Sequence, residues 1–225
     1  SDRDYLVEYL SAAAITMMHC SRLAEELILW GSKEFGFVSF DDAWTTGSSM
    51  MPQKRNPDFM ELARGKTGRV YGNLVGLLTV LKGLPLAYNR DLQEDKEAVF
   101  DTVDTLRATV EVIGSVLETA KFDTDAMERE AGDSSMLATD LADYLVSKGV
   151  AFREAYSIVA KLCSLGIPLD HIPIETFREH HRGFDQDVYK ITAKSSISGK
   201  NVAGGTAPNQ VKRAIGSARK RWLQG

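Results

Sequence analysis

The chain has 225 residues and a formal net charge of −4 at neutral pH, because 27 Lys and Arg stand against 31 Asp and Glu. Its apolar share of 44% and charged share of 26% exclude a disordered chain and a collagen-like rod. No apolar run reaches the ~20 residues that a membrane span needs, and the slight acidity argues against a nucleic-acid partner. Four His and two Cys predict neither a metal site nor a disulfide framework, and they fit a reducing, cytoplasmic compartment.

The first predicted element is a helix over residues 2–30. The chain opens at Ser1 without Met or signal peptide, as if cut into a helix already under way, which suggests a fragment. Apolar or small residues recur every three or four positions and therefore share one helical face. They are Leu6, Leu10, Ala13, Ala14, Met17, Cys20, Ala24, Leu27 and Ile28. The helix is predicted to end near Gly31.

Residues 35–57 break this pattern and predict a loop, with a short turn around Asp41–Trp44. A second helix is predicted over 58–83, because Pro57 suits a helix start and Asp58 suits the positive end of the helix dipole.

The clearest helical pattern covers residues 90–118. Apolar residues alternate at spacings of four and three, a 3.5-residue period that is typical of near-parallel helix packing in a bundle. They are Val99, Val103, Leu106, Val110, Ile113 and Leu117. Three long helices expose long apolar seams, so we expect further helices, from this chain or others, to cover them.

After Lys121 the helices become short. They are predicted at 124–131, 136–148, 151–165, 173–181 and, as a basic helix, at 212–222, with a loop-rich stretch over Ser195–Gly205. The sequence therefore predicts an all-α protein without strands or repeats. Its expected domains are 1–121, with the long helices and a loop at about 45–57, and 122–225, a small helical domain.

The chemically informative stretch is the loop GSSMMPQKRNP, residues 47–57. Gly47 gives the backbone freedom beside Ser48 and Ser49, while Lys54 and Asn56 stand just before a helix start. A cation, an amide donor and a helix N-terminus together suit a carboxylate, which predicts a small-anion site under a mobile lid. A plain surface loop remains the alternative on chemistry alone.

Two other patterns are set aside. Gly65-Lys66-Thr67 resembles the end of a P-loop, but the glycine that this motif needs at position 60 is Met60. Adjacent His180 and His181 point to different sides of a helix and lack a third ligand at useful spacing.

The loop resembles the signature of the fumarase/aspartase superfamily, GSSxMPxKxNP. Gln53 and the stretch GLPLAYNRDLQEDKE at residues 83–97 resemble the argininosuccinate lyase family in particular. The start of the chain, residues 136–140 (MLATD) and residues 204–208 (GGTAP) are also similar to that family. The resemblance spans essentially the whole chain but only the C-terminal half of the family's length.

The resemblance implies three helices of the superfamily's central helical bundle, followed by a small C-terminal helical domain. It implies elimination of fumarate from argininosuccinate to give arginine, without a metal or other cofactor. It also implies a homotetramer with active sites shared between subunits. An upstream catalytic-site His would be missing, so the fragment alone is expected to be inactive.

The resemblance also assigns roles. Ser48 would be the general base, with Ser49 as the second candidate; Lys54 would stabilise the carbanion, and Glu61 would pair with the missing His. Substrate binding is implied for Ser49, Asn56, Tyr88, Gln93 and Lys96. Arg3 is either a carboxylate contact or a surface arginine. Glu94, Asp95 and Glu97 are expected to be solvated helix charges.

Two alternatives stay open. The chain could come from another superfamily lyase, most plausibly adenylosuccinate lyase, against which the YNRDLQEDKE stretch speaks. It could also come from a noncatalytic structural protein similar to a delta-crystallin, since retained site residues do not prove turnover.

Overall fold

The computed structural model describes residues 2–47, 49–51 and 53–223. The chain separates into two compact units, Ser1–Ala126 and Met127–Gly225, which are described one at a time. Within the described ranges, none of the helices has the length and apolar character needed to cross a membrane.

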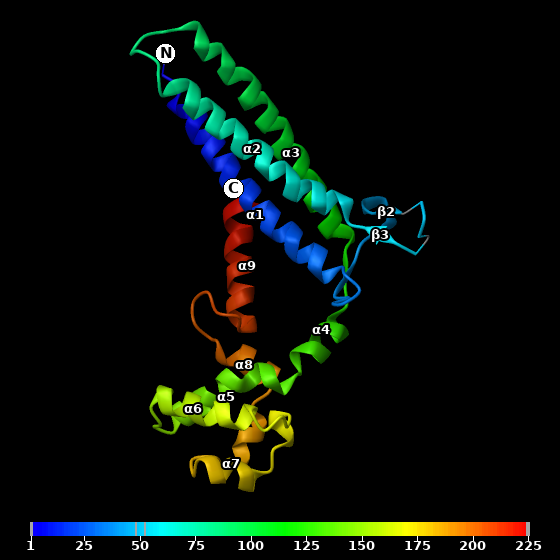
Figure 1. The fold of residues 1–225 in the computed structure, drawn as a ribbon, viewed down its shortest axis with the longest axis vertical. Helices are drawn as coiled ribbons and strands as arrows, with labels where there is room; N and C mark the ends of the chain where they lie inside the picture. Colours follow the sequence, from blue (N-terminus) through cyan, green and yellow to red (C-terminus); the bar gives the residue numbers. More distant parts are fainter. Residues whose placement is uncertain (1, 48, 52, 224–225) are drawn as a thin grey trace. The chain divides into compact units, whose positions relative to one another are not determined.

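Three long helices form the first unit: α1 (Asp4–Trp30), α2 (Asp58–Leu81) and α3 (Asp95–Thr119). They lie side by side and run alternately up and down, so α1 and α3 start at the same end (Figure 1). These bounds confirm the predicted helices, except that the α-helix α3 begins only at Asp95. The residues before it, Arg90–Glu94, form the 3₁₀ turn η2.

Short connections close the other end of this unit. After the 3₁₀ turn η1 (Asp42–Trp44), the strand β2 (Thr46–Gly47) pairs antiparallel with β3 (Arg55–Asn56). The strand β1 (Val38–Ser39) pairs with β4 (Lys121–Phe122), which joins the exits of α1 and α3. The prediction of no strands was therefore wrong at these two-residue pairs, which are too short to show alternation.

The core of the first unit confirms the seam predicted for α1. Leu10, Met17 and Leu27 are buried, and Met17 packs in one cluster with Val70 of α2 while Leu27 packs in another with Met60. The Thr67 hydroxyl of α2 donates to the backbone carbonyl oxygen of Met17 at 3.1 Å, so this helix contact also has a buried polar tie.

The packing of α3 differs from the predicted seam. The face that packs inside the unit carries Thr102, Thr105 and Thr109, whereas Val110 of the apolar seam is 47% exposed. Val103 and Leu117 are exposed as well. A threonine methyl fills the close contact between helices as a valine methyl would. A sequence pattern that considers only apolar residues therefore misses this face. Val103, Val110 and Leu117 of the predicted seam are thus left on the surface of the single chain, whereas Ile113 is buried and Leu106 packs against the core.

The second unit is a compact group of short helices. It contains the end of α4 (Thr124–Ala131), the 3₁₀ turn η3 (Ser134–Leu137), α5 (Ala138–Ser147), α6 (Phe152–Cys163), the 3₁₀ turn η4 (Leu169–His171), α7 (Ile174–His180), the 3₁₀ turn η5 (Gln186–Lys190), α8 (Ala193–Gly199) and α9 (Pro208–Trp222). Four of these confirm the predicted short helices, and α9 confirms the basic helix with an earlier start at Pro208. The predicted loop-rich stretch was wrong over α8, because Thr192 and Ser195 form a reciprocal capping box.

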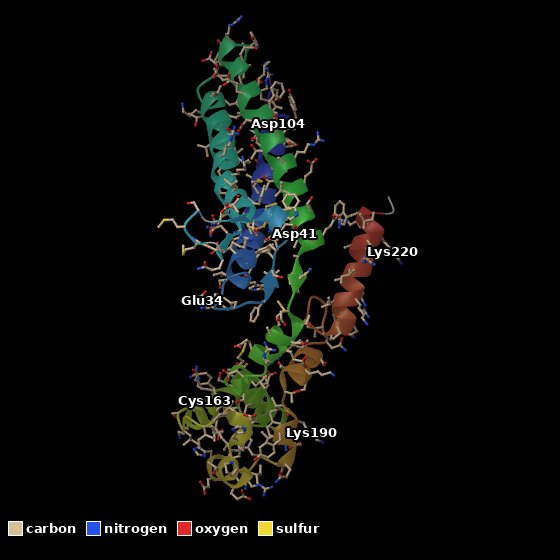
Figure 2. All side chains as sticks on the ribbon, turned by 90° about the vertical axis from the view of Figure 1, so that its right-hand side faces the viewer. Glu34, Asp41, Asp104, Cys163, Lys190 and Lys220 are labelled. Carbon is tan, nitrogen blue, oxygen red and sulfur yellow. The ribbon has the colours of Figure 1, made fainter. Side chains whose placement is uncertain are left out.

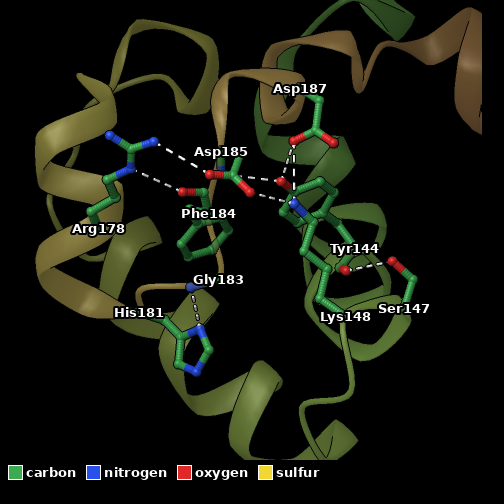
Figure 3. A network of polar contacts seen from close by, with 9 residues as sticks. All are labelled: Tyr144, Ser147, Lys148, Arg178, His181, Gly183, Phe184, Asp185 and Asp187. Carbon is green, nitrogen blue, oxygen red and sulfur yellow. Dashed lines mark hydrogen bonds and ion pairs between the residues drawn. The ribbon is translucent and has the colours of Figure 1, made fainter.

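A polar network joins α5 to the segment after α7 (Figure 3). Lys148 Nζ lies 2.9 Å from Asp185 Oδ2 and 3.5 Å from Asp187 Oδ1, and 4.6 Å from the centre of the Tyr144 ring. The Tyr144 hydroxyl donates to Asp187 and accepts from the backbone N–H of Asp185 at 3.1 Å. Arg178 Nη2 lies 3.3 Å from the other oxygen of Asp185.

This network should make the second unit sensitive to acid. The hydrogen bond from Lys148 lowers the pKa of Asp185, and the Tyr144 hydroxyl lowers the pKa of Asp187. A lowered folded-state pKa contributes stability that is present above the unfolded value of about 3.9 and is lost as pH falls through the folded value. We therefore expect Lys148→Gln to destabilise the second unit most at neutral pH, with a difference from wild type that shrinks towards pH 2.

Urea unfolding at several pH values, followed by NMR signals of the second unit, measures this difference. Lys161→Gln removes the same charge from an exposed position on α6 and serves as the control. A Lys148→Gln penalty that stays constant with pH would contradict a role of the ion pairs.

Candidate functional site

The predicted base loop forms a hairpin at the start of α2. Thr46 pairs with Asn56 and Gly47 with Arg55, so β2 and β3 lie side by side in opposite directions (Figure 1). The backbone N–H of Lys54 donates to the carbonyl oxygen of Met51 at 3.0 Å, which tightens the return. The predicted base Ser48 lies outside the described residues, as does Pro52.

Two side-chain contacts tie this hairpin to its surroundings. The Thr46 hydroxyl donates to the carboxylate of Asp58 in the first turn of α2. Arg55 Nε donates to Asp42 Oδ1 of η1 at 3.0 Å. Acidic side chains at a helix start are favoured by the helix dipole, so Asp58 both begins α2 and holds β2 through Thr46.

The predicted groups of the loop are accessible. Ser49, Lys54 and Glu61 are exposed, and Asn56 is half-buried. Glu61 stands in the first turn of α2, the helix that directly follows the loop. Lys54, Asn56 and Glu61 thus stand close in sequence to the N-terminus of α2.

The second predicted group lies in the turn between α2 and α3. Gln93 Nε2 donates to the Tyr88 hydroxyl at 2.9 Å, and both side chains are exposed. Gln93 belongs to η2, while Lys96 stands in the first turn of α3. Lys96 Nζ lies 3.2 Å from Asp95 Oδ1.

Asp95 corrects one expectation, because it is not a solvated helix charge. It is 3% exposed, and its second oxygen accepts from Arg3 Nε at 2.6 Å. Burial raises the pKa of Asp95, but the hydrogen bonds from Arg3 and Lys96 outweigh burial and hold this pKa below its ordinary value. One buried carboxylate is therefore paired with two cations, so the cluster of Arg3, Asp95 and Lys96 carries one net positive charge by itself.

Arg3 is likewise no free surface arginine, since it bridges the starts of α1 and α3. Sequence reasoning missed this pair because its members lie 92 positions apart. The predicted topology could have suggested this pair. In three helices that alternate in direction, the first and third start at the same end, so residues at their starts lie close together.

The two groups do not meet within one chain. The hairpin precedes α2 and the Tyr88–Lys96 turn follows it, and the 24 residues of α2 span about 36 Å at 1.5 Å per residue. Lys54, Asn56 and Glu61 therefore stand at the start of α2, whereas Tyr88, Gln93 and Lys96 stand beyond its end.

No set of three His, Cys, Asp or Glu side chains in the described ranges is arranged to hold a metal ion.

Comparison with protein families supports the signatures. A family model described as "Lyase" matches residues 1–72, and one described as "Argininosuccinate lyase C-terminal" matches residues 135–197. An argininosuccinate lyase of Dehalococcoides mccartyi is 52% identical over 98% of this chain and 49% of its own length. One of Moorella thermoacetica is 52% identical over 98% of this chain and 48% of its own. The chain thus spans about half the length of these curated relatives.

Solved structures agree with this relationship. A variant of EDDS lyase with bound fumarate superposes with a TM-score of 0.86 at 26% identity, covering 99% of this chain and 47% of that chain. A class II fumarase from Schistosoma mansoni shares the fold, with a TM-score of 0.64 at 16% identity over 80% of this chain and 39% of that chain. The chain belongs to the argininosuccinate lyase family of the fumarase/aspartase superfamily and carries the C-terminal half of the family's sequence.

Proposed function

We propose that a full-length protein containing this chain is an argininosuccinate lyase, which acts in the cytoplasm in the last step of arginine biosynthesis. It would eliminate fumarate from argininosuccinate and release arginine, with no cofactor. The observation that carries the proposal is the 52% identity to curated argininosuccinate lyases over 98% of this chain. The complete signature loop of residues 47–57 adds to it.

The proposed chemistry follows from where charge develops. Removing a proton from the carbon beside a carboxylate pushes negative charge onto that carboxylate, so fixed cations and donors there lower the barrier. We assign this role to Lys54 and carboxylate binding to Asn56 and Ser49. Ser48 would take the proton, which requires a lowered hydroxyl pKa in a closed, water-free site beside a cation. Glu61 would orient a His supplied from elsewhere.

The separation of the two groups supports a shared active site. A small substrate cannot reach both ends of a helix about 36 Å long, so Tyr88, Gln93 and Lys96 must complete a site whose base comes from another copy. We therefore propose a homotetramer in which different subunits supply the two ends.

A groove on α1 and α2 supports assembly. It is lined almost entirely by apolar side chains, including Ile15, Met18, Tyr71, Leu74 and Val75. Exposed apolar surface of this kind marks a protein contact. In this proposal, residues 1–121 are the central-bundle part and residues 122–225 are the small C-terminal domain.

The test compares the chain with a full-length lyase that contains it. We expect the full-length enzyme to release fumarate and arginine from argininosuccinate and to leave adenylosuccinate intact. The chain alone should release no fumarate, because half of the family's length is outside it. The full-length Moorella relative, assayed alongside, shows that the assay works.

Each outcome separates the alternatives. Fumarate release by the chain alone would contradict a site that needs the rest of the protein. Turnover of adenylosuccinate would favour the related lyase, and a folded full-length protein without turnover of either would favour the delta-crystallin-like alternative.

A further inference from the structure

A buried carboxylate lies directly beside the proposed substrate lysine. Asp95 is buried, although it stands in the first turn of α3 next to the exposed Lys96. Burying a carboxylate is costly unless cations and hydrogen-bond donors surround it. Here Arg3 Nε lies 2.6 Å from Asp95 Oδ2, and Lys96 Nζ lies 3.2 Å from Asp95 Oδ1. Each carboxylate oxygen therefore holds a different cation, one from the start of α1 and one from α3.

The arginine side of this cluster is fixed. The Arg3 side chain is only 17% exposed, and its Nη1 also donates to the backbone carbonyl oxygen of Asp2 at 3.1 Å. Its guanidinium is therefore held from two directions, by the backbone before α1 and by the carboxylate of Asp95. Because the same bond joins the starts of two long helices, the Asp95 carboxylate has a fixed position in the folded unit.

The lysine side of the cluster needs this anchor. The Lys96 side chain is 50% exposed, and its flexible four-carbon stem gives a free ammonium many positions. Neighbouring residues of a helix do not normally face each other, so the Lys96 stem bends back to reach Asp95. One of the three N–H donors of the ammonium then points to Asp95, and two remain for a ligand. The ammonium is thus held in one region while it stays accessible.

The same end of the unit carries the other two proposed substrate groups. Gln93 Nε2 donates to the Tyr88 hydroxyl at 2.9 Å. The pKa of Arg3 is raised by its hydrogen bond to Asp95 and further by the charge of the ionised Tyr88 phenol, so this phenol lies near Arg3. The start of α3 lies at the top of Figure 2, beyond the labelled Asp104. A displaced Asp95 carboxylate would therefore move a cation within the proposed substrate site.

We propose that Asp95 is a positioning residue, whose carboxylate is fixed by Arg3 and holds the Lys96 ammonium in place for the substrate. This inference rests on the proposed lyase function, in which Lys96 contacts the substrate. An ammonium that is held before the substrate arrives loses less conformational freedom on binding, so binding is tighter. Because Ser48 takes the proton in the proposed reaction, loss of this positioning should raise KM and leave kcat nearly unchanged.

A double-mutant cycle in a full-length lyase that contains this chain tests the coupling, with argininosuccinate as the substrate. Asp95→Asn keeps the size of the side chain but removes its charge, and we expect it to raise KM about tenfold with kcat changed less than about threefold. Lys96→Gln should raise KM at least as much. Adding Asp95→Asn to Lys96→Gln should raise KM by less than about a further twofold, because no ammonium is left to hold. Glu97→Gln makes the same charge change at an exposed neighbour and should leave KM within about twofold of wild type.

A second background covers the case in which Asp95→Asn alone does not fold. Arg3→Gln with Asp95→Asn removes both charges of the buried pair and leaves no unpaired guanidinium. In this background Lys96→Gln should raise KM at least about fivefold less than it does in the wild type. An undiminished effect there would overturn the positioning role.

The outcomes separate this inference from the proposed function. Additive effects of Asp95→Asn and Lys96→Gln in an active enzyme would overturn the inference alone, since a merely structural carboxylate costs the same with or without the ammonium. An unchanged or lower KM in Asp95→Asn would also overturn it, because the carboxylate would then only compete with the substrate for Lys96. A folded wild type without turnover of argininosuccinate would overturn the proposed function, and the inference with it.

Discussion

Replacing Ser48 with alanine in a full-length lyase that contains this chain is expected to lower kcat by about 10²–10⁴-fold. A general base takes part in the proton transfer but adds little to substrate binding, so kcat and kcat/KM should fall together while KM changes little. Steady-state kinetics with argininosuccinate, together with the dissociation constant measured by calorimetry, separate the two effects.

Ser49→Ala is the matched control, because it removes the neighbouring hydroxyl from the same loop. We expect it to weaken substrate binding while turnover persists. If Ser49→Ala instead abolishes turnover and Ser48→Ala leaves it near normal, Ser49 is the base and Ser48 has no part in the mechanism.

Replacing Phe184 with alanine is expected to give the largest loss of stability in the second unit. Phe184 is 0% exposed, stacks on Tyr144 at 5.9 Å between ring centres and contacts Phe177 at 4.9 Å. Removing a buried phenyl ring costs about 3–5 kcal/mol through lost burial and the cavity left behind. In a unit of this size that lowers the melting temperature by about 10 °C or more.

Thermal unfolding followed by circular dichroism measures the change, with protease sensitivity of the second unit as a second readout. Phe152→Ala, on the same unit but 55% exposed, should stay within about 1 kcal/mol of wild type. Similar losses in both variants would mean that the Phe184 cluster is not the core that holds this unit together.

The helices could be predicted from the sequence because their signals are local. A seam repeating every three or four residues and the residues around Pro57 act within a few turns of chain, and they set α1 and α2 closely. Which face of α3 turns inward depends on the neighbouring helices, and Thr102, Thr105 and Thr109 fit there although an apolar pattern assigns that place to valines.

In the candidate site, too, the local motifs could be predicted from the sequence, whereas the contacts between distant residues could not. The signature loop and the Tyr88–Lys96 stretch are continuous in sequence, so their residue types and spacing identified them directly. Asp95 looked like its exposed neighbours until Arg3, from the start of another helix, proved to be its partner.

The all-α class, the three long helices, the signature loop and the family can all be read from the amino-acid sequence, since each depends on neighbouring residues or on a continuous motif. The folded structure was needed to find the inward face of α3, the pairing of the buried Asp95 with Arg3 and Lys96, and the separation of the two groups of site residues. These depend on helix direction and packing, which join residues far apart in the chain. That distance of about 36 Å along α2 is the physical reason to propose a site built by more than one copy.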